Sequence, residues 1–270
     1  MKRLANVLFV GPTLSLFGLF FLLPMVMLAI VSLGGGSAGG FTLNNYVQII
    51  SNPRYAKALF NSTWLSLVVT AATLVIAGVI AFFLARTNFK GKNLYMSLIT
   101  FPLSLPGVVV GFMIIILFGT TGVVPMLTQA LTGVASGRIA YTIPGIFLSY
   151  LYFTIPRIVM TIYGSVVEFD VRLEEAARTV GANEQQAIFL VVIPTLMPVF
   201  LSAAALSFYT SMGAFGTAFT LANQFEIIPI VMYTDFTLNF KIASASAMAI
   251  AVGVICVALN MVSRALLERA

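Results

Sequence analysis

Six long apolar stretches dominate the 270-residue sequence and restrict what it can fold into. A helix needs about 20 consecutive apolar residues to cross the hydrocarbon core of a bilayer. Because that core holds no water, every crossing segment has to pair its own backbone polar groups. We therefore expect an all-α membrane protein whose six transmembrane helices lie roughly at residues 7–33, 62–85, 95–118, 139–163, 197–221 and 242–266.

The low charge content supports the same fold class. Only 8% of the residues are charged and 60% are hydrophobic, whereas a soluble domain carries about 25% charged residues. So few charges cannot cover a water-facing surface, and residues 1–270 are expected to form a single transmembrane domain. The first stretch is expected to be a retained helix, because it is longer than the apolar region of a signal peptide and contains Pro24.

The residue types that are rare in the chain limit its chemistry. There is no histidine, and Cys256 is the only cysteine, so imidazole chemistry and an internal disulfide are excluded. The net charge of +6 is spread between the apolar stretches, which is typical of membrane-flanking residues. We therefore expect no catalytic residue, no metal site and no nucleic-acid partner.

The positive charges fall unevenly on the two sides of the membrane. With the N-terminus in the cytoplasm, the inner side carries Lys2, Arg3, Arg86, Lys90, Lys92, Arg172, Arg178, Arg264 and Arg269. The outer side carries Arg54, Lys57, Arg138 and Lys241. The excess of nine basic residues on the inner side over four on the outer side predicts that both termini are cytoplasmic.

Arg157 lies within the predicted fourth span and is assigned to neither side of the membrane. We expect its long side chain to reach toward the inner end of its helix, where the charge meets water. The alternative is that Arg157 binds an anion within a transport pathway.

A polar segment, residues 168–194, interrupts the apolar pattern between the fourth and fifth stretches. Glu174 and Arg178 are spaced to pair along one turn of a short helix. Gly181 is placed to end that helix, because glycine adopts the left-handed conformation without penalty. Together these signals predict a helix, a tight turn and a second helix on the cytoplasmic side, with capping and boundary residues at Asp170, Asn183, Gln186 and Pro194.

The same segment resembles the EAA loop of ABC importer permeases. That loop begins with Glu-Ala-Ala, followed after three residues by a glycine. After nine further residues comes an aliphatic residue, then any one residue, a second aliphatic residue and a proline. Every spacing is met here, by Glu175, Ala176, Ala177, Gly181, Val191, Ile193 and Pro194. Without this pattern, an ordinary amphipathic loop on the membrane surface would be an equal alternative.

Further stretches carry the resemblance along most of the chain. Residues 103–111 are similar to the Pro-Gly segment in the third helix of these permeases. Pro12 and residues 20–24, 41–46 and 61–62 are similar to the spermidine/putrescine branch. The resemblance implies the type I ABC importer permease fold, with six transmembrane helices and a cytoplasmic coupling helix, in a bacterial inner membrane.

The resemblance also implies partners. In such importers the EAA loop docks in a groove of a cytoplasmic ATPase, and the residues implied to couple with it are Glu174, Glu175, Ala176, Ala177, Gly181 and Pro194. The chain has no GxxxxGK[ST] motif, so ATP and Mg are expected on an ATPase dimer and no cofactor on this chain. The other implied partners are a second permease subunit, identical or related, an extracytoplasmic solute-binding protein and membrane lipid.

The solute route is expected where small residues and prolines interrupt the helices. Prolines free backbone carbonyls and bend a helix, and residues 207–216 mix small, hydroxyl and aromatic side chains. The alternative is that these residues are helix-packing surfaces. The pathway candidates are Pro106, Gly107, Gly111, Phe208, Ser211, Gly213 and Phe215.

The solute itself is predicted less sharply. Similarity to the spermidine/putrescine branch favours a polyamine such as spermidine or putrescine. Glu226 and Asp235 are the only acidic residues expected near the outer mouth, so an opine, a phosphonate or another small anion is an alternative. An ion-coupled secondary transporter is less favoured, because no acidic residue falls clearly inside a predicted span, and a non-transport scaffold would not need the EAA spacing.

Overall fold

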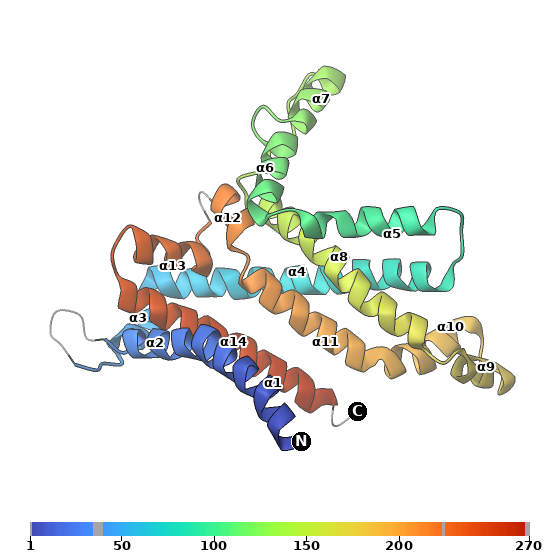
Figure 1. Cartoon of the computed structure of the whole chain (residues 1–270). Coiled ribbons are helices and arrows are strands. Elements are labelled where there is room, and N and C mark those ends of the chain that lie inside the picture. Colours follow the sequence, from blue (N-terminus) through green and yellow to red (C-terminus); the bar gives the residue numbers. More distant parts are fainter. Residues whose placement is uncertain (1, 35–39, 223–224, 268–270) are drawn as a thin grey trace. The chain divides into compact units, whose positions relative to one another are not determined.

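The computed structural model describes residues 2–34, 40–222 and 225–267, and its regular structure there is helical, apart from one bridge between Gly34 and Phe41 (Figure 1). Six of the described helices are long and apolar enough to cross a membrane, which confirms the predicted fold class. These candidate spans are Val10–Ser32, Pro53–Arg86, Gly107–Thr132, Ile143–Glu168, Glu184–Met212 and Ile242–Ala265.

The chain forms two compact units. The first comprises residues 1–58 and 231–254, and the second residues 59–230 and 255–270. The first unit contains α1 (Lys2–Phe17), the π-helix η1 (Gly18–Leu22), α2 (Leu23–Ser32), α3 (Asn44–Ser51), the start of α4 (Pro53–Arg86), most of α13 (Ile228–Thr237) and the first half of α14 (Ile242–Leu267).

The second unit contains most of α4 and the remaining central elements. They are α5 (Lys92–Thr100), the 3-10 helix η3 (Phe101–Ser104), α6 (Gly107–Phe118), α7 (Val123–Thr132), α8 (Ile143–Glu168), α9 (Val171–Thr179), α10 (Glu184–Ala187), the π-helix η4 (Ile188–Val192), α11 (Ile193–Met212) and α12 (Phe215–Leu221). A buried apolar cluster joins α4, α8 and α11 through residues such as Leu84, Ile162 and Leu196. A second cluster contains Leu65, Ile146 and Leu221.

Both π-helices lie directly before a proline. Pro24 and Pro194 each occupy the second position of the helix that follows. A proline has no N–H to donate to the carbonyl four residues earlier. The amide N–H of the residue before each proline instead donates to the carbonyl five residues earlier: Leu23 to Gly18, and Ile193 to Ile188. The helix continues through this widened turn.

The second span starts earlier than its apolar pattern indicates. The prediction began at residue 62, but α4 begins at Pro53, a residue suited to the first turn of a helix. Hydropathy marks the lipid-embedded part of a helix and misses a polar extension. Trp64 therefore lies well inside α4.

The third and fifth predicted spans are each broken. Leu105 is extended (φ −88°, ψ 132°) between η3 and α6, because the residue before a proline is disfavoured in the helical region. The helix predicted at 197–221 instead ends at Met212, and Gly213 and Ala214 separate α11 from α12. On its other side this helix extends back continuously to Glu184.

All three connections predicted on the outer side contain a helix: α3, α7 and α13, respectively. Asp235 of α13 is fully buried, so the expectation that it lines an outer mouth is wrong. Its carboxylate accepts hydrogen bonds from the hydroxyl of Tyr55 (2.5 Å) and from Nδ2 of Asn239 (2.8 Å). Nη1 of Arg54 lies 3.9 Å from the same group. A buried carboxylate needs such partners, and Asp235 thereby connects α13 to the start of α4 within the first unit.

Gly111 lies where α6 packs closely on α12. A Cβ added there would overlap the side chain of Thr220. Close helix contact through glycine is common in membrane bundles, so the geometry assigns Gly111 to packing. On the same surface, a Cβ added at Gly107 would meet the backbone of Gly216 and Thr217. A Cβ added at Gly216 would meet the backbone of Gly107 and Val108.

Replacing Gly111 by alanine is therefore expected to destabilise the protein by about 1–3 kcal/mol, the usual cost of overpacking. The measurement is the temperature at which the detergent-solubilised protein loses its monodisperse peak. Gly164→Ala in α8 is the matched control, because nothing lies within 4 Å of a Cβ added at Gly164. Equal midpoints for the two variants would contradict the packing role of Gly111.

Candidate functional site

The EAA-like segment folds into the predicted helix, turn and helix. The carboxylate of Asp170 caps α9 by accepting from the amide of Arg172 at 3.0 Å. Gly181 has φ +99°, and the turn is closed by the amide of Ala182, which donates to the carbonyl of Ala177. These contacts confirm the predicted cap and the predicted left-handed glycine.

The second half of this segment also follows the predicted pattern. Oδ1 of Asn183 accepts from the amide of Gln186 at 2.8 Å, and Oε1 of Gln186 accepts from the amide of Asn183 at 2.9 Å. This reciprocal capping box fixes the start of α10. Within the second unit, Figure 1 shows α9 and α10 beside each other next to the ends of α8 and α11.

The candidate coupling residues divide by exposure. Glu175, Ala176, Gly181 and Pro194 are exposed, and Ala177 is half-buried. Glu174 is only 4% exposed. The structure therefore leaves the side chain of Glu175 exposed, while Glu174 faces the protein interior.

Two arginines bind the carboxylate of Glu174. Arg178, one turn later on α9, donates from Nη2 to Oε1 at 2.8 Å, which confirms the predicted pair. Arg86, the last residue of α4, donates from Nη1 to Oε2 at 2.5 Å. No sequence pattern signalled the second contact, because 88 residues separate its partners.

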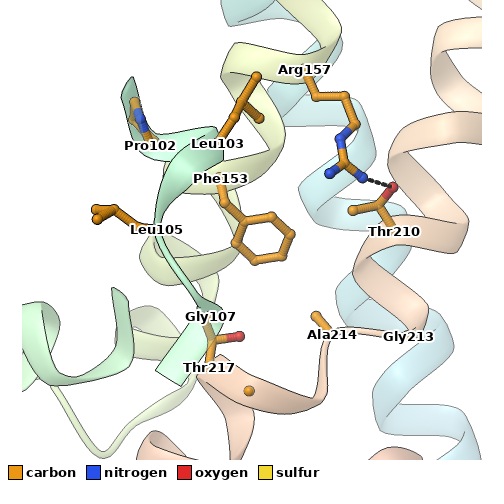
Figure 2. Close-up of a pocket in the computed structure, with 11 residues that line it drawn as sticks. Pro102, Leu103, Leu105, Gly107, Phe153, Arg157, Thr210, Gly213, Ala214 and Thr217 are labelled. Atoms are coloured by element: carbon orange, nitrogen blue, oxygen red, sulfur yellow. Dashed lines mark hydrogen bonds between the residues drawn. The ribbon is translucent and has the colours of Figure 1, made fainter. Parts of the chain in front are cut away.

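A pocket of about 280 Å³ lies where the two helix breaks of the second unit meet (Figure 2). The break at Leu105 comes from the third span and the break at Gly213 from the fifth. The pocket is lined by Pro102, Leu103, Leu105, Gly107, Phe153, Arg157, Thr210, Gly213, Ala214, Gly216 and Thr217.

Only part of the predicted pathway set reaches this pocket. Gly107 and Gly213 line it. The remaining candidates do not: Phe208 and Ser211 are buried in the bundle, Gly111 packs against α12, and Pro106 and Phe215 lie outside the lining.

Arg157 is the only charged residue in the lining of this pocket. It sits near the middle of α8, between Ile143 and Glu168, and its Nη1 donates to Oγ1 of Thr210 at 3.2 Å (Figure 2). The expectation that Arg157 reaches toward the helix end is therefore wrong. The guanidinium instead faces the pocket, which Thr210 and Gly213 also line.

Thr217 adds a hydroxyl to the same lining. Its Oγ1 is buried and has no hydrogen-bond partner among the described residues. A buried hydroxyl normally finds a partner. The guanidinium of Arg157 thus brings hydrogen-bond donors to this space, whereas the hydroxyl of Thr210 already donates to the carbonyl of Leu206. No carboxylate lines the pocket. Sequence reasoning weighed Arg157 as an anion ligand and included Thr210 in a candidate stretch, but had no signal for Thr217.

The described residues contain no group of three or more carboxylate or cysteine side chains that would hold a metal ion. Glu174 serves ion pairs and Asp170 serves a helix cap. The two candidate sites are the exposed face of α9 and the pocket around Arg157.

Comparison with known families gives one match that covers most of the chain. The model of the family described as "Binding-protein-dependent transport system inner membrane component" matches residues 74–270.

Curated relatives fall into three solute classes. A molybdenum transport system permease protein, ModB, from Haemophilus influenzae is 32% identical over 166 residues, which are 60% of this chain and 71% of the relative. A sulfate transport system permease protein, CysT, from Escherichia coli is 30% identical, over 76% of this chain and 73% of the relative. A spermidine/putrescine permease protein, PotB, from H. influenzae is 26% identical, over 87% and 85%.

Solved structures support the fold. A chain of a bacterial alginate ABC transporter, in complex with an alginate-bound periplasmic protein, superposes with a TM-score of 0.81 over 99% of this chain and 95% of that one. The sequence identity is 16%. A chain of the methionine transporter MetNI matches less fully, with a TM-score of 0.56 over 77% of this chain.

Proposed function

This chain belongs to the family of binding-protein-dependent transport system inner membrane components, as a permease of an ABC importer, and from that premise we propose that it moves a small oxyanion. It is a multi-pass inner membrane protein and a non-catalytic component. Permease subunits of this kind carry no cofactor. The observation that carries the proposal is the position of Arg157 in a pocket whose lining has no acidic residue.

The electrostatic environment favours an anion. An arginine at the centre of a membrane helix costs about 2.5–3.5 kcal/mol on insertion scales. Such residues mark solute routes when they face a cavity. The planar guanidinium of Arg157 matches an oxyanion geometrically, and its donors face the pocket beside Thr210. Sulfate or molybdate supplies acceptor oxygens on every side.

A polyamine fits this pocket less well. A cationic solute needs carboxylate contacts, and Asp235, one of the two acids considered for that role, is buried and bound by Tyr55. The relatives named for molybdenum and sulfate are more identical to this chain than the relative named for spermidine and putrescine. The polyamine relative spans more of the chain, and a polyamine is therefore the second candidate.

The proposed assembly follows the importer pattern. The excess of basic residues on one side supports cytoplasmic termini and a cytoplasmic α9. We assign the exposed face of α9, with Glu175 and Ala176, to docking of a partner ATPase. A second permease, related or identical, and a solute-binding protein complete the importer. The alginate transporter match supports this arrangement through its shared fold.

The test is to measure which solute the cognate binding protein captures and the reconstituted importer moves. Titration calorimetry of the binding protein with sulfate, molybdate, spermidine and putrescine gives the first answer. Uptake of the captured solute into proteoliposomes with ATP gives the second. We expect capture and uptake of an oxyanion. Capture of spermidine or putrescine would overturn the oxyanion proposal and favour the second candidate.

A further inference from the structure

Glu174 occupies an unusual position for a residue of a docking loop. Its side chain is 5% exposed, and each carboxylate oxygen pairs with a different arginine. Arg86 is on α4, and Arg178 is on α9 itself. A buried carboxylate is stable only when its charge is compensated in this way. The two adjacent glutamates therefore have different surroundings, since Glu175 is exposed.

From this geometry we propose that Glu174 is a positioning residue that ties α9 to the end of α4, so that α4 moves with the coupling helix. The inference rests on the proposed docking of an ATPase on α9. It is independent of which solute is carried.

Chain continuity explains why α4 needs such a tie. α9 follows α8 after Phe169 and Asp170, and α10 continues through η4 into α11. Motion of the coupling segment therefore reaches α8 and α11 along the chain. α4 has no such connection, because Arg86 and Glu174 are 88 residues apart. The ion pair supplies a non-covalent attachment.

The packing beside the ion pair supports a rigid attachment. Leu84 of α4, Val166 of α8, Phe169 and Val192 of η4 belong to one buried cluster. The guanidinium of Arg86 also lies 5.9 Å from the ring centre of Phe169, close enough for a cation–π contact. α4, α8 and α11 therefore meet in one core at the end where Glu174 binds Arg86. Closely packed helices transmit motion as rigid bodies.

The first test removes the ion pair in the assembled importer, with the ATPase and the solute-loaded binding protein. The variants are Glu174→Gln, Arg86→Gln and the double variant, with Glu184→Gln as the control, since Glu184 is exposed and 4.0 Å from Arg178. We expect the ATPase to co-purify with each variant at the wild-type level. Stimulation of ATP hydrolysis by the loaded binding protein should fall about 2- to 30-fold in the ion-pair variants, with the double variant no worse than either single one.

Unchanged stimulation in Glu174→Gln would overturn the proposal. So would loss of the ATPase from Glu174→Gln, because Glu174 would then be a docking residue. If the ATPase does not bind the wild-type chain, the proposed docking itself fails, and that result is separate from the other two.

A second test replaces the ion pair by a covalent cross-link, and it applies if the glutamine variants fold poorly. Arg86→Cys and Glu174→Cys are combined in a Cys256→Ser background and joined by a short bis-maleimide. If the tie is mechanical, the cross-link should restore the stimulation that the uncross-linked pair has lost. If the cross-linked importer remains unstimulated, the charges themselves are required and the mechanical proposal is wrong.

Discussion

Replacing Arg157 by glutamine is expected to lower the uptake of a small oxyanion about 10- to 100-fold, the usual value of a hydrogen bond to a charged group. The guanidinium is the only charge in the pocket lining, so glutamine leaves neutral donors and removes the attraction. The measurement is the initial rate of uptake into proteoliposomes that contain the ATPase and the loaded binding protein.

Two variants separate the role of Arg157 from a general loss of charge. Lys90→Gln removes one positive charge from an exposed position outside the candidate spans, and uptake should be unchanged. Arg157→Lys keeps the charge but loses the planar fork, and uptake should be intermediate. Assembly with the ATPase should be normal in all three. Wild-type oxyanion uptake by Arg157→Gln would remove the main support for an oxyanion solute.

Thr217 shows why this pocket was only partly visible in the sequence. Pro106 was recognisable as a place where a helix bends, because a proline acts on its own backbone, whereas the break at Gly213 lies inside a helix predicted to be continuous. The meeting of the two breaks depends on how α6, α8, α11 and α12 pack. The orientation of Arg157 toward Thr210 depends on that packing, whereas the sequence led us to expect the side chain to reach toward the inner end of its helix.

The EAA-like segment was far more predictable, and its contacts explain the difference. The caps at Asp170 and Asn183 and the pair between Glu174 and Arg178 join residues at most four positions apart. Local chemistry determines such contacts. The contact from Glu174 to Arg86 joins distant helices, as does the contact from Asp235 to Tyr55, and neither leaves a periodic signal.

The six spans were also correct in number, while their limits shifted where polar residues extend a helix. α4 gains its first turns from Pro53, Arg54 and their neighbours, which a hydropathy pattern assigns to a loop. In contrast, the break at Gly213 removes residues from the fifth helix that their apolar character had included. Hydropathy reports the environment of a residue, and backbone conformation is a separate property.

Replacing Glu175 by lysine is expected to weaken retention of the ATPase by at least about 30-fold, as is typical when one partner of a desolvated charge pair is lost. Glu175 is exposed on α9, and within the described residues its carboxylate makes no hydrogen bond or ion pair. Reversing the charge should therefore leave the fold of the permease intact. The measurement is the amount of ATPase that co-purifies with the solubilised chain, together with the thermal stability of the chain alone.

Glu168→Lys is the matched control for this last prediction. Glu168 is also exposed and lies at the end of α8, outside the EAA-like helix, so the same charge change should leave ATPase retention near the wild-type level. Comparison with Glu174→Gln then assigns a different role to each of two adjacent glutamates. Glu175→Lys should lose the ATPase, while Glu174→Gln should keep it and lose stimulation. If both variants lose the ATPase equally, burial of Glu174 does not separate the two roles, and α9 docks as a whole.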